Sequence, residues 1–228
     1  MTVRGSGTFC RRAAVLAVLL PALLGGCAAG RRQLPSAAGP VAAGEAPAVT
    51  GPTVARLDGG REGFVIREAP ALEERSRDDF ARAVAMLNRE DHAAAIELLL
   101  QVIEASPGVS APYINIAIAY RLTGRPEEAE RHLRTAMALI PDHPAAGNEY
   151  GLLLRQSGRF AEARTVYEQV LAAYPDYHPA RRNLGILCDL YLHDLECALE
   201  QYQIYSAAMP DNEPVRRWIV DLKQRLKR

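Results

Sequence analysis

The sequence predicts an all-α fold, built as a stack of helical hairpins. Between Ala111 and Pro175, residues of the same kind recur at a period of 34 positions. Small residues recur where the two helices of a hairpin would approach most closely. A glycine and a proline recur where the first and the second helix would end. The recurring positions are Ala117, Tyr120, Gly124, Ala129, Leu133, Ala136 and Pro141, which become Gly151, Leu154, Gly158, Ala163, Tyr167, Val170 and Pro175.

A 34-residue period with these residue types resembles the tetratricopeptide repeat. A generic helical bundle is the alternative, but it has no reason to repeat at a fixed period. The resemblance implies a right-handed superhelix, an α-solenoid. It also implies that the first helices of the hairpins line a concave groove, which is the usual binding face of a solenoid.

The period extends in both directions and predicts about four repeats within residues 71–210. The first is the least typical, with helices at about Leu72–Arg89 and Asp91–Ala105 around a polar turn that replaces the glycine. The fourth holds one inserted residue in its turn, around Tyr191 to Asp194, because the next proline, Pro210, comes one position late. The predicted repeats are about 76–109, 110–143, 144–177 and 178–211.

Residues 212–228 are predicted to close the stack with a helix from Pro214 to Lys227. A helix that is polar on its outer side is the expected cap of an open solenoid. Its apolar stripe has helical spacing and consists of Val215, Trp218, Ile219, Leu222 and Leu226.

Residues 1–26 are predicted to be a lipoprotein signal peptide. Three arginines precede an apolar run, Ala13–Leu24, that is short for a membrane span. The run ends in Leu24-Gly25-Gly26-Cys27, which resembles the bacterial lipobox. That resemblance implies cleavage before Cys27 and its lipidation; an ordinary signal peptide cut elsewhere is the alternative. Ala28 in place of aspartate favours the outer membrane, facing the periplasm, over the inner membrane.

Residues 27–70 are rich in alanine, glycine and proline, a composition that predicts a flexible, disordered linker after the lipidated cysteine. Phe64-Val65-Ile66 is the one apolar island in this stretch. It is compatible with a short strand or with docking on the first repeat, although the composition favours a weakly ordered segment.

The sequence carries no recognisable catalytic constellation. Its five histidines are scattered without metal-ligand spacing, and phosphate-binding glycine loops and nucleophile elbows are missing. The 27 basic and 27 acidic residues include three arginines of the leader, so the remainder is weakly acidic, unlike a nucleic-acid-binding protein. We therefore expect no enzyme activity, cofactor, metal, small-molecule substrate or nucleic acid.

Cys188 and Cys197 flank the inserted turn of the fourth hairpin, on its opposite arms. Residues equally distant from a helical turn face each other, so their sulfur atoms could meet. In an oxidising compartment a disulfide is one interpretation, and two buried thiols are the other.

The first helices carry a candidate peptide-binding groove. Asparagines recur in three repeats, and a carboxamide can pair with the backbone of an extended peptide. Arginines between them could hold carboxylates, and isoleucines and leucines could take apolar side chains. The alternative is that the asparagines serve only the helix starts and the arginines are solvated. The paired lysines of the chaperone-tail carboxylate clamp are missing. The candidate residues are Asn115, Ile118, Arg121, Asn148, Glu149, Leu152, Arg155, Arg182, Asn183 and Ile186.

Together these features predict a non-enzymatic, lipid-anchored scaffold that binds a peptide or protein partner in cell-envelope assembly. The lipobox and repeats resemble those of pilus-assembly lipoproteins of the pilotin and Tad types, which implies a role in pilus or secretion-system biogenesis. Two alternatives stay open: an adaptor for cell-wall hydrolases or proteases, and a non-catalytic subunit of an envelope enzyme.

Overall fold

The computed structural model describes residues 52–56 and 64–227, all within one compact unit, Ala48–Arg228. The predicted signal peptide, Cys27 and the linker up to residue 51 lie outside the described residues. The elements are β1 (Thr53–Arg56), β2 (Phe64–Arg67), α1 (Glu74–Leu87), α2 (His92–Ala105), α3 (Ser110–Leu122), α4 (Pro126–Leu139), α5 (Pro144–Gln156), α6 (Phe160–Ala173), α7 (His178–Leu187), the π-helix η1 (Cys188–Leu192), α8 (Leu195–Ala208) and α9 (Glu213–Arg225).

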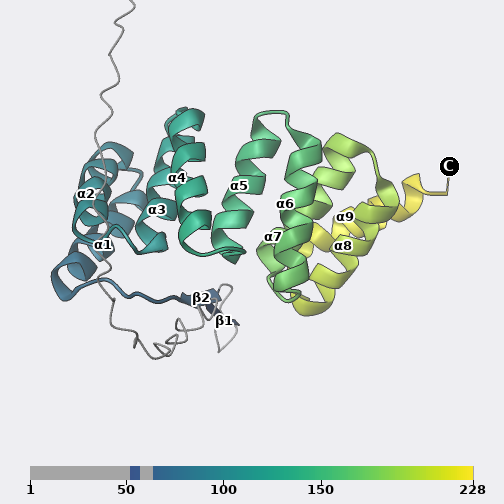
Figure 1. Cartoon of the computed structure of the whole chain (residues 1–228). Coiled ribbons are helices and arrows are strands. Elements are labelled where there is room, and N and C mark those ends of the chain that lie inside the picture. Colours follow the sequence, from purple (N-terminus) through teal and green to yellow (C-terminus); the bar gives the residue numbers. More distant parts are fainter. Residues whose placement is uncertain (1–51, 57–63, 228) are drawn as a thin grey trace, which may run out of the picture. The chain divides into compact units, whose positions relative to one another are not determined.

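The helices pack in chain order, and each contacts the next (Figure 1). The pairs α1–α2, α3–α4, α5–α6 and α7–α8 are the hairpins, and α9 packs on α8. The first helices also contact one another, α1 with α3, α3 with α5 and α5 with α7, so they form one layer of the stack. This arrangement confirms the predicted all-α solenoid.

The close approach of helices within each hairpin depends on the small residues of the repeat. A Cβ atom at Gly151 would lie 2.5 Å from the ring of Tyr167, and one at Gly185 would lie 2.5 Å from the ring of Tyr202. Both tyrosines are almost completely buried. The glycines therefore let a large aromatic ring fill the space between two helix backbones.

The turn inside each hairpin needs a residue in the left-handed conformation. Gly124 and Gly158 take it with φ of +74° and +75°. Glu90 holds the corresponding place in the first repeat at φ 63°, and His193 holds it in the fourth at φ 55°. All four described hairpins therefore have a residue with positive φ in the turn, although only two of them have glycine there.

The inserted residue of the fourth repeat is absorbed by the π-helix η1. A π-helical turn closes its hydrogen bond over one residue more than an α-helical turn, so it accommodates one inserted residue. The Asp194 amide donates to the Cys188 carbonyl oxygen over 2.9 Å, which closes the turn. The Asp194 side chain then caps α8 by accepting from the amide of Cys197.

The sequence favoured a flexible linker for residues 27–70, but the described part of this stretch contains two strands, β1 and β2. They pair antiparallel, with Thr53 opposite Arg67 and Arg56 opposite Phe64. Along β2 the side chains alternate, and Phe64 and Ile66 pack against the core of the solenoid. The docking site is the junction of the third and fourth repeats rather than the first repeat, since Phe64 lies against Tyr177 and His178. Burial of one face provides order that glycine- and proline-rich composition does not indicate.

Among the described helices, none combines the length and the apolar character that crossing a bilayer would need.

Candidate peptide-binding groove

A polar ladder crosses the first helices of three successive repeats. Arg121 of α3 pairs with Glu149 of α5 at 3.2 Å. The side-chain amide of Asn148 donates to Glu149 over 3.4 Å, and that of Asn183 on α7 donates to Asn148 over 2.9 Å. Four of the predicted groove residues are therefore brought together, and we call this set the polar ladder. Its members satisfy one another, so the ladder fixes the spacing of α3, α5 and α7.

The ladder lies largely out of water. The side chains of Arg121 and Glu149 are only 15% and 18% exposed, and both asparagines are buried. Burial raises the pKa of Glu149, and the neighbouring Arg121 guanidinium opposes that rise. The Glu149 carboxylate is thus held by the Arg121 guanidinium and the Asn148 side-chain amide, with little access to water.

Asn115 does not join the ladder. Its amide donates to the Ala111 carbonyl oxygen of its own helix over 2.9 Å. This contact is the local role that the sequence left open as the alternative. The predicted apolar positions Ile118, Leu152 and Ile186 are half-buried.

Arg155 and Arg182 retain hydrogen-bonding capacity. Within the described residues the Nε atom of each is buried without a hydrogen-bond partner. The Arg155 guanidinium lies 5.6 Å from the ring centroid of Tyr191, a cation–π contact. Asp189, the residue at the matching place in the next repeat, is instead paired with Arg225 of α9 at 2.7 Å. The buried Nε atoms are out of reach of an outside partner, so only the terminal amino groups of these two half-buried side chains can donate to a carboxylate or carbonyl group of a ligand.

Residues 108–176 match the family model described as tetratricopeptide repeat. This part of the stack, helices α3 to α6, thus consists of tetratricopeptide repeats, and we call the whole helical stack the tetratricopeptide-repeat domain. A curated relative, protein FlbA of Caulobacter vibrioides, is 26% identical over 132 residues, which cover 58% of this chain. The match spans only 22% of FlbA.

Solved structures of other repeat proteins share the fold. PilF of Pseudomonas aeruginosa has a TM-score of 0.62 at 20% identity, covering 68% of this chain and 70% of that one. PilW, described as a type IV pilus biogenesis factor, has a TM-score of 0.60 at 21% identity, covering 67% and 70%. MamA of Desulfovibrio magneticus RS-1 has a TM-score of 0.58 at 21% identity, covering 69% and 88%.

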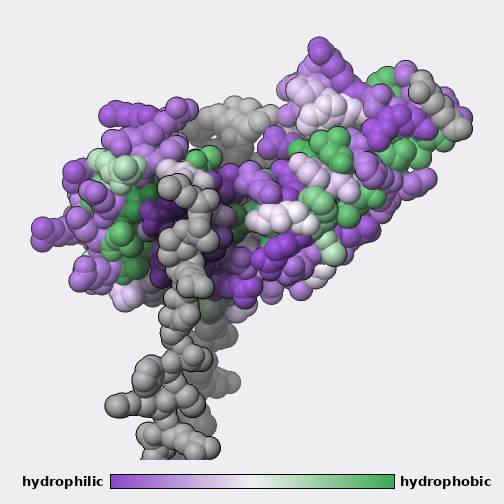
Figure 2. Space-filling view, turned by 90° about the horizontal axis from the view of Figure 1, so that it is seen from above, coloured by the Kyte–Doolittle hydropathy of each residue, from purple (hydrophilic) through white to green (hydrophobic). Residues whose placement is uncertain are grey.

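The tetratricopeptide-repeat domain also presents apolar side chains near the C-terminal ends of its first helices. Leu122 is 52% exposed, and Leu190 and Tyr191 of η1 are 60% and 42% exposed. On the face shown in Figure 2, apolar residues form separate patches among hydrophilic ones. The sequence did not indicate Tyr191 as a candidate groove residue. Its contact with Arg155 depends on the π-helix η1, which the sequence pattern did not predict.

At the opposite ends of the first helices, Glu68 joins the linker to the tetratricopeptide-repeat domain. Its carboxylate accepts from the Ala111 amide over 2.8 Å and from the Ser110 hydroxyl. It also lies 3.9 Å from the Nε2 atom of His143. Burial lowers the pKa of His143, and Glu68 opposes this. Helix α3 has no capping side chain of its own at Val109, so Glu68 supplies the missing acceptor.

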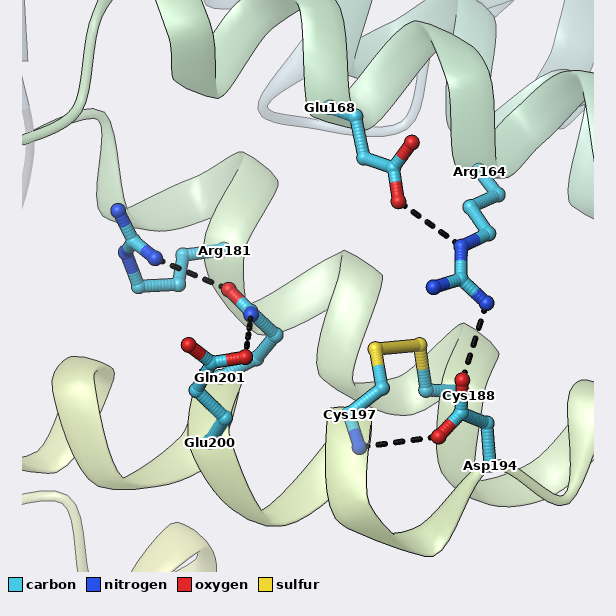
Figure 3. The surroundings of a disulfide bond; sticks show 8 residues. All are labelled: Arg164, Glu168, Arg181, Cys188, Asp194, Cys197, Glu200 and Gln201. Carbon is cyan, nitrogen blue, oxygen red and sulfur yellow. Dashed lines mark hydrogen bonds and ion pairs between the residues drawn. A yellow bond between two sulfur atoms is a disulfide. The ribbon is translucent and has the colours of Figure 1, made fainter.

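A disulfide joins Cys188 to Cys197 and ties η1 to the start of α8 (Figure 3). Beside it, Asp194 pairs with Arg164 at 3.0 Å and accepts from the Cys197 amide over 3.0 Å. The sulfur atoms and an Asp194 oxygen lie within 4.8 Å of one another, which is close enough for metal ligands. Because the two sulfur atoms are bonded to each other, neither is a thiolate ligand in this state.

Proposed function

We propose that this protein is a non-enzymatic scaffold, held on the outer membrane through a lipidated Cys27 and facing the periplasm. Its tetratricopeptide-repeat domain binds a peptide or protein segment of a cell-envelope assembly. The observation that carries the proposal is the polar ladder, which joins three first helices. Arg155 and Arg182 lie on two of these helices, α5 and α7, and the Nε atom of each has no hydrogen-bond partner.

A pilus or secretion system is the assembly we favour. Its support is the likeness in fold to PilF and to PilW, the latter described as a type IV pilus biogenesis factor. The lipobox-like Leu24-Gly25-Gly26-Cys27 supports the anchor. Mass spectrometry of the mature N-terminus tests the anchor directly: a triacylated Cys27 is expected, and a free N-terminus elsewhere would contradict it.

Partner capture tests the binding role. The full-length protein, cross-linked in envelopes and purified, is expected to recover pilus or secretion-system components. Recovery of cell-wall hydrolases or proteases instead would favour the adaptor, and recovery of none of these would contradict both scaffold versions.

Two variants test whether the groove makes the contact. Replacing both Arg155 and Arg182 with alanine removes the two arginines with unused donors, so capture is expected to fall several-fold. Gln169→Ala, at an exposed position of the second helix α6, is the matched control and leaves capture unchanged. Unchanged capture by the double variant, with helicity intact by circular dichroism, would rule out this groove.

A further inference from the structure

A pocket of about 520 Å³ lies where the β-hairpin meets the turn between α6 and α7. Two segments that are far apart in the sequence form its walls, the strands on one side and the start of α7 on the other. The lining residues are Val54, Phe64, Ala173, Tyr174, Pro175, Asp176, Tyr177, His178 and Ala208.

Aromatic rings dominate this pocket. The Phe64 ring lies 5.0 Å from that of Tyr177 and 5.9 Å from that of His178, measured between centroids. Tyr174 adds a third phenyl or phenol ring to the lining, and its hydroxyl donates to the Pro52 carbonyl oxygen over 3.5 Å. The same contacts that hold the hairpin in place therefore also build the ring-lined wall.

One acidic side chain lines the pocket. Asp176 supplies an exposed carboxylate to the lining. Among the lining residues that the structure describes, none is a lysine or arginine. Arg181, which does not line the pocket, donates to the Pro175 carbonyl oxygen over 2.7 Å and interacts electrostatically with Asp176. Asp142, in the equivalent turn of the preceding repeat, adds a second negative charge near Tyr174. Burial raises the pKa of this tyrosine, and Asp142 raises it further.

We propose that this pocket binds an arginine side chain of a partner protein. Three aromatic rings can cover the aliphatic stem and attract the cation through their faces, and the Asp176 carboxylate can pair with it. Arginine fits better than lysine because its planar guanidinium stacks on rings and pairs with a carboxylate through two hydrogen bonds. This site lies outside the polar ladder, so the inference does not depend on the proposed groove.

Saturation-transfer difference NMR with the full-length protein tests the assignment, using N-acetyl-arginine amide as the probe. N-acetyl-citrulline amide has nearly the same shape without the charge, and is expected to bind roughly fivefold more weakly. Equal binding of the two would overturn the proposal and leave an apolar pocket. Binding of neither would also overturn it.

Variants locate the site. Asp176→Asn is expected to abolish the preference for arginine over citrulline, because it removes the carboxylate from the lining. Asp211→Asn is the matched control: Asp211 follows a proline in the next repeat turn, is exposed, and does not line the pocket. Tyr174→Leu should weaken arginine binding, and Tyr174→Phe, which keeps the ring, should not. An unchanged preference in Asp176→Asn would overturn the proposal.

Discussion

The carboxylate of Glu68 accepts a hydrogen bond from the backbone amide of Ala111 over 2.8 Å, although the two residues are 43 positions apart. Glu68 thereby caps α3 from outside the helix, and it also holds the buried hydroxyl of Ser110. A carboxylate at a helix N-terminus satisfies free amides and interacts favourably with the helix dipole. Residues 64–68, which come before α1, are thus part of the folded domain rather than a passive spacer.

Glu68→Ala should destabilise the protein by about 1–2 kcal/mol, because it removes this cap and leaves the Ser110 hydroxyl without its partner. Urea unfolding followed by circular dichroism measures the change. Glu73→Ala is the control, since Glu73 is exposed and its side chain makes no capping bond. Equal effects of the two variants would show that the Glu68 contact contributes nothing.

Stability should fall as the pH falls below the ordinary histidine pKa of about 6.5. Burial lowers the pKa of His143, so the unfolded chain takes up a proton at a higher pH than the folded one. The neutral ring is also needed, because its Nδ1 atom accepts from the Ala146 amide. His143→Asn keeps a capping acceptor without titrating and should flatten this slope. An unchanged slope would assign it to His132, whose pKa burial also lowers.

Gly151→Ala should destabilise the domain by about 1–3 kcal/mol, because the new methyl group would overlap the buried Tyr167 ring. Thermal unfolding measures the loss. Gly108→Ala is the control: its added Cβ would meet only Pro70, at an ordinary contact distance of 3.7 Å. If Gly151→Ala unfolds at the same temperature as Gly108→Ala, the ring has room to move and the close-approach argument is wrong.

Reduction should cost the fourth repeat about 2–3 kcal/mol, the loop-closure contribution of a disulfide with a sequence separation of 9. Denaturant unfolding with and without dithiothreitol measures it, and a variant with both Cys188 and Cys197 changed to alanine should lose the dependence on reductant. Alkylation under native, unreduced conditions followed by mass spectrometry is a second test. Labelling of both cysteines there would exclude the bond.

The repeat was readable from the sequence because its causes are local. Gly124 and Gly158 lie where the backbone needs a positive φ, and Gly151 lies where the Tyr167 ring needs space. The residue type at each of these positions therefore indicates its structural role. The insertion near Tyr191 was also visible as a shift of the period, although the π-helix that absorbs it was not. Features that depend on residues within one hairpin could be predicted.

Contacts between distant segments could not be predicted in the same way. The docking of Phe64 depends on Tyr177, more than 100 positions later, and no local pattern specifies that pairing. The groove asparagines were placed on the correct helices, but their side-chain directions were not. Asn148 and Asn183 turn toward each other, whereas Asn115 bonds to its own helix, and this difference follows from tertiary packing.

The Arg121–Glu149 pair should contribute more to stability than a shorter ion pair on the surface. The Arg82–Asp79 pair measures 2.9 Å against 3.2 Å, but its side chains are 65% and 30% exposed. Water screens that pair, so Arg82→Ala should cost well under 1 kcal/mol. Arg121→Ala should cost about 1–3 kcal/mol, because it leaves a largely buried carboxylate without its cation.

The pH dependence separates this cause from lost packing. Without Arg121, the pKa of Glu149 should rise further above its ordinary value of 4.5, since the group that opposes its burial is gone. A carboxyl with a raised folded-state pKa favours the folded state in acid and loses that advantage as the pH rises through it. The deficit of Arg121→Ala should therefore be largest at neutral pH and shrink as Glu149 protonates. A deficit that is constant with pH would assign the loss to packing of the arginine stem.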